Sequence, residues 1–141
     1  MQIGVESSKA VENKRLFIVD TDEINRMALQ FMLHDENEAH DLPTLEAAYD
    51  KSIDWKPDLI LLGLGVVQER GIGVLAEIKS KMPTAKILLV SESAEDPLTK
   101  ESLASGADGL LLKPFTIESS RKKVDFMLGR KNTTKIQIHA M

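Results

Sequence analysis

Residues 57–65 read Pro-Asp-Leu-Ile-Leu-Leu-Gly-Leu-Gly, and this stretch decides the fold. Leu59 to Leu62 form an apolar run that is too short for a helix and suits a strand buried on both faces. Pro57 and Asp58 precede the run, and Gly63 and Gly65 follow it, so both of its ends are marked by turn-forming residues. We therefore predict a central buried strand, followed by a flexible loop of the kind where open α/β sheets bind ligands.

Further runs of this kind alternate with helical patterns along the chain. We predict strands at 16–19, 39–42, 59–62, 86–90 and 110–112. Helical spacing is carried by Ile24, Met27, Ala28 and Phe31, and later helices are expected at 44–53, 74–82, 94–105 and 117–128. Strands alternating with helices in this way indicate an α/β protein with a doubly wound, five-stranded parallel sheet.

Candidate site residues directly follow four of the predicted strands. Right-handed crossovers bring the carboxyl ends of parallel strands to one edge of the sheet. Residues 20–22 (Asp-Thr-Asp), Gly63, Ser91 and Lys113 should therefore lie close together, although they are far apart in the sequence.

Composition narrows the classes of function. The 141 residues carry a net charge of −4 and no cysteine, which argues against nucleic acid as the main partner and excludes disulfides and thiolate sites. No apolar run is long enough for a membrane helix, and the first 14 residues lack a signal peptide's apolar segment. We expect a cytoplasmic domain at 14–130 between flexible tails at 1–13 and 131–141, without membrane contact.

The order of the motifs resembles the receiver domain of bacterial two-component response regulators, over residues 14–130. The strongest fragment is Gly106-Ala107-Asp108 followed by Lys113-Pro114-Phe115; residues 16–20, 57–62, Gly71 and Ser91 also match in order and spacing. The resemblance implies a flavodoxin-like fold. It also implies an acidic pair after the first strand, a phosphoacceptor aspartate at the end of the third, Ser or Thr after the fourth and Lys-Pro after the fifth.

The chain departs from that pattern at the positions that carry the chemistry. The phosphoacceptor falls on Gly63, which has no carboxylate to accept a phosphoryl group. The family's direct Mg²⁺ ligand falls on Thr21, and Asp22 is one residue out of register and is expected to face the helix end. Leu110 stands where the family carries its switch aromatic residue. Asp20 alone remains of the three acids, so the chain looks like a pseudo-receiver.

The remaining pocket residues allow two interpretations each. Asp20 either holds a weak cation or pairs with Lys113, and we expect the Asp20–Lys113 contact, worth about 1.5–3 kcal/mol if shielded from water. Ser91 either binds an anion or bonds the nearby backbone. We predict no metal and no cofactor, because the histidines lack metal spacing and Gln68 replaces the third glycine of a dinucleotide motif.

These observations favour a phosphorylation-independent interaction module in signalling, which is not an enzyme. Its partner would be a sensor kinase, another signalling protein or a second copy, bound through the last two helices and the last strand. Two alternatives stay open: a receiver with a displaced phosphoacceptor, Asp20 or Asp22, and a small-ligand sensor that uses the emptied pocket. A divalent ion beside Thr21, or an aspartate moved into the place left by Gly63, would count against the first hypothesis.

Overall fold

The structure, a computed structural model, describes residues 13–130 and consists of strands that alternate with helices. The five strands are β1 (Lys14–Val19), β2 (Asn37–Leu42), β3 (Leu59–Gly63), β4 (Lys86–Ser91) and β5 (Gly109–Leu112). The helices are α2 (Glu23–Leu33), α3 (Leu45–Ser52), α4 (Leu64–Arg70), α5 (Val74–Lys81), α6 (Pro97–Ala104) and α7 (Ile117–Leu128). The predicted tails lie outside the described residues, apart from Asn13.

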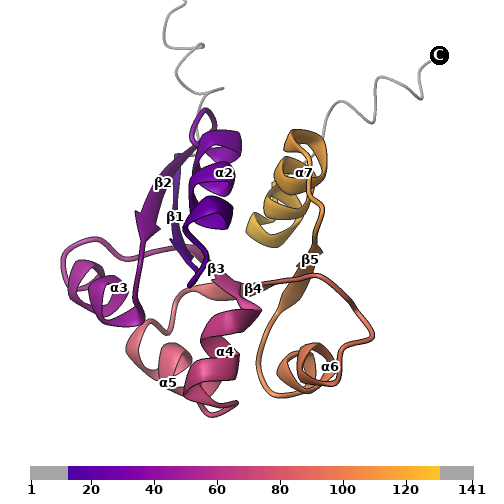
Figure 1. Cartoon of the computed structure of the whole chain (residues 1–141). Helices are drawn as coiled ribbons and strands as arrows, with labels where there is room; N and C mark the ends of the chain where they lie inside the picture. The colour runs from indigo at the N-terminus through magenta and orange to yellow at the C-terminus, as the bar shows by residue number, and fades with distance from the viewer. Residues whose placement is uncertain (1–12, 131–141) are drawn as a thin grey trace, which may run out of the picture.

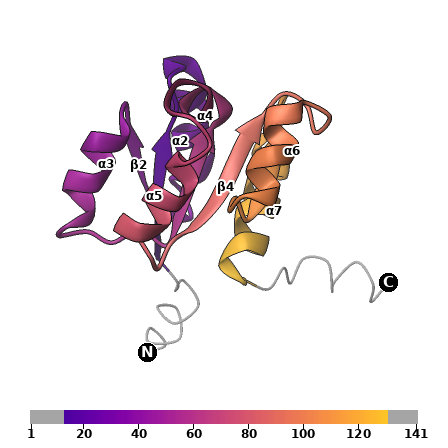
Figure 2. The ribbon, with the colours of Figure 1, turned by 90° about the horizontal axis from the view of Figure 1, so that it is seen from below.

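All five strands pair in parallel in one sheet of order β2-β1-β3-β4-β5. Helices α2 and α7 cover one face, and α3, α4, α5 and α6 cover the other (Figures 1 and 2). Strand β3 lies at the centre and is buried along its whole length. This is the doubly wound α/β sheet that the sequence predicts. Among residues 13–130, no helix is long and apolar enough to cross a membrane.

The segment after β3 corrects one prediction, because it is a helix and not a flexible loop. Gly63 is the N-cap of α4, and the helix ends at Gly71, whose φ of 90° lies in the region that favours glycine. Val66 and Val67 are buried against the sheet, so the segment gains apolar contacts that an open loop would not make. As a result, α4 follows the central strand directly and forms one wall of the candidate site.

The first helix is present as predicted, but the residues that carry the predicted spacing are not the ones that it buries. The sequence offers two stripes at helical spacing on α2, and Leu29 and Leu33 are the residues that enter the core. The other stripe is open to solvent: Ile24 is 76% exposed, Met27 55% and Phe31 68%. Periodicity alone cannot rank two stripes on one helix. The choice depends on which stripe meets the sheet and α7.

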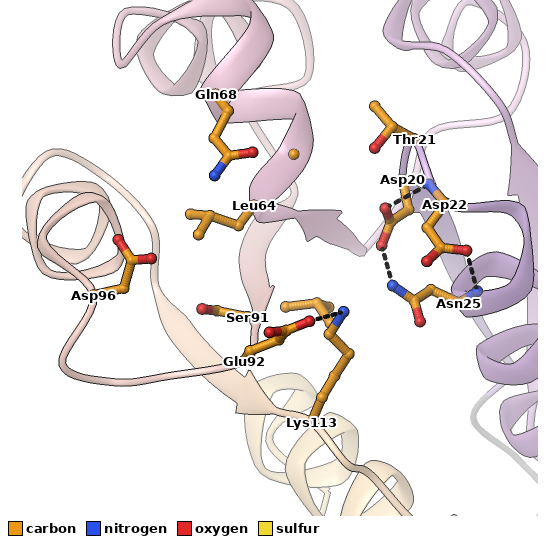
Figure 3. Close-up of a pocket in the computed structure, with 12 residues that line it drawn as sticks. Asp20, Thr21, Asp22, Asn25, Leu64, Gln68, Ser91, Glu92, Asp96 and Lys113 are labelled. Carbon is orange, nitrogen blue, oxygen red and sulfur yellow. Dashed lines mark hydrogen bonds and ion pairs between the residues drawn. The ribbon is translucent and has the colours of Figure 1, made fainter.

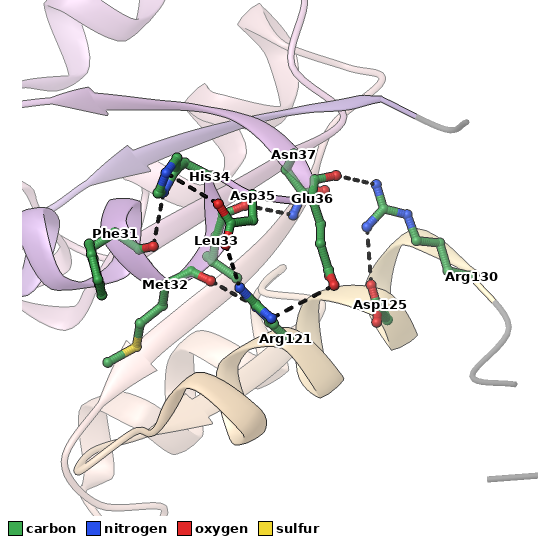
Figure 4. Close-up of polar contacts among 10 residues, drawn as sticks. All are labelled: Phe31, Met32, Leu33, His34, Asp35, Glu36, Asn37, Arg121, Asp125 and Arg130. Carbon is green, nitrogen blue, oxygen red and sulfur yellow. Dashed lines mark hydrogen bonds and ion pairs between the residues drawn. The ribbon is translucent and has the colours of Figure 1, made fainter. Parts of the chain in front are cut away.

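Side chains hold the C-terminal end of α2 in place (Figure 4). The carbonyl groups of Phe31, Met32 and Leu33 have no acceptor role inside the helix, and each accepts a bond from a side chain instead. The donors are His34 Nδ1 at 3.0 Å, Arg121 Nε at 3.0 Å and Asn37 Nδ2 at 3.1 Å, respectively. Arg121 comes from α7, so this contact fixes the C-terminal end of α2 against α7.

A charged network fixes the outer strand β2 to β1. Arg15 on β1 donates from Nε and Nη2 to the carboxylate of Glu38 on β2, at 2.7 and 3.2 Å. His40 Nε2 lies 2.7 Å from the same carboxylate. Hydrogen bonding from Arg15, and to a smaller extent from His40, lowers the pKa of Glu38 to about 2. The outer strand β2 is therefore held by charge as well as by backbone pairing with β1.

Candidate functional site

Five of the predicted site residues, Asp20, Thr21, Asp22, Ser91 and Lys113, line a cavity of about 300 Å³ at the carboxyl edge of the sheet, and Gly63 is not part of its lining (Figure 3). Acidic side chains dominate its lining: Asp20, Asp22, Glu92 and Asp96 stand against one cation, Lys113. The other residues that line it are Thr21, Asn25, Leu64, Gly65, Gln68, Val90 and Ser91. The convergence expected from the strand order is thus present, and the cavity has a negative charge balance.

Asp20 lies against the backbone of Gly63. A Cβ atom on Gly63 would stand 2.6 Å from Asp20 Oδ1 and closer still to Cγ and Oδ2. No real Cβ approaches a heavy atom that closely, so the carboxylate of Asp20 occupies the space that a side chain on residue 63 would need. Asp20 is 5% exposed, and it accepts bonds from the Asp22 N–H at 2.9 Å and from Asn25 Nδ2 at 3.3 Å.

The expected pairing of Asp20 with Lys113 is wrong. Lys113 Nζ lies 3.5 Å from Glu92 Oε2, and Asp20 is not within ion-pair distance of it. The reason is geometric: Asp20 follows β1 and turns toward β3 and α2, whereas Lys113 follows β5 at the far edge of the sheet. Glu92 is 82% exposed, so its ion pair with Lys113 is a weak, solvated one.

Asp22 and Thr21 have structural partners of their own. Asp22 is the N-cap of α2, and its Oδ1 accepts bonds from the N–H groups of Ile24 and Asn25 at 2.9 and 3.3 Å. This agrees with the prediction that Asp22 faces the helix end. Thr21 packs against Gly65, where a Cβ atom would lie 2.6 Å from Thr21 Oγ1. Glycines at 63 and 65 thus let the β1–α2 loop approach the first turn of α4.

The residues of the site do not fit a magnesium ion of the kind that the receiver family binds. Mg²⁺ needs near-octahedral oxygen ligands, usually with one or two carboxylates that are free to face it. Here Asp20 is bonded and turned against Gly63, and Asp22 caps α2. Among residues 13–130, no group of three or more His, Cys, Asp or Glu side chains is arranged to hold a metal ion.

Ser91 and Leu110 both make contacts in the interior of the protein. Ser91 is 2% exposed, and its Oγ lies 2.8 Å from Thr99 Oγ1 on α6 and also bonds the backbone of Ser93. Of the two interpretations of Ser91, anion binding and bonding to the nearby backbone, the second describes these bonds. The bond to the Thr99 hydroxyl on α6 is an additional one. Leu110 packs against the larger core cluster, on the face covered by α3 to α6.

Sequence reasoning did not find Asn25, Asp96 and the role of Glu92 as the partner of Lys113. Asn25 lies in the first turn of α2, and its amide donates a hydrogen bond to Asp20, a local contact that spacing from the strand end does not reveal. Asp96 bonds the Leu98 N–H as the N-cap of α6, and Asp before Pro at a helix start was an available signal.

The fold and the site together define a receiver-type signalling domain: a five-stranded parallel sheet with an acidic pocket and a lysine at its carboxyl edge. The model of the response regulator receiver domain family matches residues 16–125. The chain therefore belongs to the response regulator receiver domain family.

Known proteins similar to this chain include a transcriptional regulatory protein and several response regulators. The transcriptional regulatory protein SrrA of Staphylococcus aureus is 26% identical over 127 residues, which cover 90% of this chain and 52% of SrrA. The chain thus spans about half the length of this relative. A two-component response regulator from Clostridium difficile is 27% identical with a TM-score of 0.72, covering 85% of this chain and 99% of that one. A response regulator from Thermotoga maritima shares the fold at 20% identity, with a TM-score of 0.74 over 84% of this chain and 99% of that one.

The contact between Asp20 and Gly63 makes a quantitative prediction. The φ and ψ of Gly63, −68° and 142°, suit any residue, so Gly63→Ala introduces only the steric conflict. We expect it to lower the free energy of unfolding in urea by about 1–3 kcal/mol. Adding Asp20→Ala should remove most of that cost, giving a favourable coupling in a double-mutant cycle.

Gly73→Ala is the matched control, because Gly73 has a negative φ and nothing within 4 Å of the added Cβ. It should change stability by less than about 0.5 kcal/mol. Equal costs at the two glycines, or additive effects of Gly63→Ala and Asp20→Ala, would contradict the close approach of Asp20.

Proposed function

We propose that this receiver domain acts without phosphorylation, as a protein-interaction module in cytoplasmic signalling. The observation that carries the proposal is the carboxylate of Asp20 in the space next to Gly63. The chain lacks an acceptor side chain on β3, and the room for one is filled. Four acids against one lysine around the pocket also oppose the approach of an anionic phosphodonor.

A second candidate is a receiver whose phosphoacceptor is Asp20. The Asp20 carboxylate does lie in the space that a side chain on residue 63 would occupy. This arrangement counts against phosphorylation independence. Three features weigh against this candidate. Asp20 is almost fully buried, both of its oxygens accept hydrogen bonds, and the lysine that would meet a phosphoryl group pairs with Glu92.

The hypothesis that the domain is a small-ligand sensor has less support from the structure than from the sequence. That hypothesis requires room vacated by the missing side chains, and Asp20 and Thr21 lie in the spaces next to Gly63 and Gly65. The cavity that remains is open, polar and acidic, unlike the mostly apolar pockets that bind small organic ligands.

Intact-mass spectrometry after incubation with acetyl phosphate and Mg²⁺ tests the proposed function. We expect no phosphoryl adduct, while an ordinary receiver domain treated in parallel acquires one. A stoichiometric adduct would overturn phosphorylation independence. Its loss in Asp20→Asn, but not in Asp22→Asn, would then identify Asp20 as the acceptor.

For the partner surface we propose the face formed by α6, β5 and α7. Apolar side chains stand exposed on these elements: Leu103 is 36% exposed, Leu112 42% and Phe126 75%. In the part of the chain that the structure describes, β5 is the last strand of the sheet, and no strand pairs with its outer edge. Lys123 Nζ lies 5.9 Å from the Phe126 ring, which places a cation beside the exposed aromatic residue.

Two aromatic variants separate this surface from α2. Phe126→Ser should reduce capture of a specific protein partner from the native host by at least about tenfold, because exposed aromatic residues often dominate binding energy. Phe31→Ser is the matched control, since Phe31 is 68% exposed on the apolar stripe of α2. Sedimentation of both variants tests whether the partner is a second copy. If Phe31→Ser abolishes capture and Phe126→Ser does not, the surface lies on α2 and the proposed face is wrong.

A further inference from the structure

Two helices of equal length on the same face of the sheet are held by different chemistry. Helices α5 and α6 each have eight residues. Helix α5 buries Val74, Leu75 and Ile78. Helix α6 buries Thr99 and Ser102, and Leu98 is only partly buried. Because burial of apolar surface is the main favourable term in packing, α6 gains much less than α5 from its contact with the core.

One of the two buried hydroxyls of α6, that of Ser102, makes the packing of the helix weaker still. Ser102 is fully buried, and its Oγ has no hydrogen-bond partner among the described residues. A buried hydroxyl without a partner loses its bonds to water and gains none in return. Exposure of Ser102 to water would restore those bonds, so this residue favours a state in which α6 has lifted from the sheet.

We propose that α6 is a detachable helix, which leaves the sheet in the folded protein while α5 and the strands stay in place. Its N-terminal end is connected to the pocket, since Ser91 Oγ lies 2.8 Å from Thr99 Oγ1 and Ser91 lines the cavity (Figure 3). Detachment breaks this bond and uncovers the core cluster that contains Leu89 and Ala107, against which Leu98 and Leu110 pack. The inference concerns the motion of α6 alone and does not depend on whether the domain is phosphorylated.

Native-state hydrogen exchange of the full chain, followed by NMR, tests this. Amides that are bonded within the two helices are compared, such as Lys100 N–H to Asp96 O in α6 and Met82 N–H to Ile78 O in α5. Local opening exposes only the amides of the unit that opens. We expect the amides of α6 to be at least about tenfold less protected than those of α5. Their exchange should also depend less on urea concentration, because detachment of one helix exposes less surface than global unfolding does.

Substitutions then test the cause. Ser102→Ala removes the unpartnered hydroxyl and should raise the protection of α6 relative to α5 by about threefold or more. Glu101→Gln, on the exposed side of the same helix, is the control and should leave that ratio unchanged. Ser91→Ala removes the bond to Thr99 and should lower the ratio.

Equal protection of α5 and α6 in the unmodified chain would overturn the proposal. So would exchange of α6 amides with the urea dependence of global unfolding. If Ser102→Ala and Glu101→Gln change the protection of α6 equally, the buried hydroxyl does not cause the detachment and that part of the proposal is wrong.

Discussion

The close approach of Asp20 to the backbone of Gly63 is the contact on which the rest of the site depends. This approach is possible only because residue 63 has no side chain. It turns the carboxylate of Asp20 away from Lys113. Thr21 makes a similar contact with Gly65 in the first turn of α4. The two glycines therefore let a loop that would face a ligand pack against protein instead.

This packing changes what the receiver scaffold can do. The sheet, the helices and the lysine after β5 are those of the family. The acids at the carboxyl edge have other roles: Asp22 and Asp96 cap helices, and Asp20 occupies the space beside Gly63. An acid that caps a helix or accepts two hydrogen bonds is poorly placed to ligate an ion or to attack a phosphorus atom. A surface that recognises another protein needs none of this chemistry, and the scaffold that would present it is intact.

The parts of the fold that the sequence could predict are those set by local patterns. Buried runs such as Leu59 to Leu62 indicated the strands, and the order of strands and helices indicated the parallel sheet. Helix α4 was missed because glycines at 63, 65 and 71 mark a loop by composition, while its stability comes from the burial of Val66 and Val67. The buried face of α2 could not be predicted, because two apolar stripes share one helix and only tertiary contacts choose between them.

For the site as well, some features could be predicted from the sequence and others could not. Those of its members that directly follow a strand were predictable, because parallel strands bring their carboxyl ends together, whereas Asn25 and Asp96 were not found. Its contacts were not, because an ion pair between Asp20 and Lys113 was inferred from charge alone. The Asn25 amide and the space beside Gly63 compete for Asp20, and neither can be weighed without coordinates. The role of Asp22 was predictable because capping is a local interaction.

The central claim is that Asp20 is committed to Gly63 and α2 and is not free to hold a divalent ion. Amide NMR during a titration with Mn²⁺, a paramagnetic ion with the ligand preferences of Mg²⁺, measures this directly. We predict that the amide signals of Asp20, Gly63 and Lys113 broaden no more than those beside other surface acids, such as Glu95 and Glu118, at equimolar Mn²⁺. Selective loss of the Asp20 and Gly63 signals at that concentration would show a working metal site and contradict the claim.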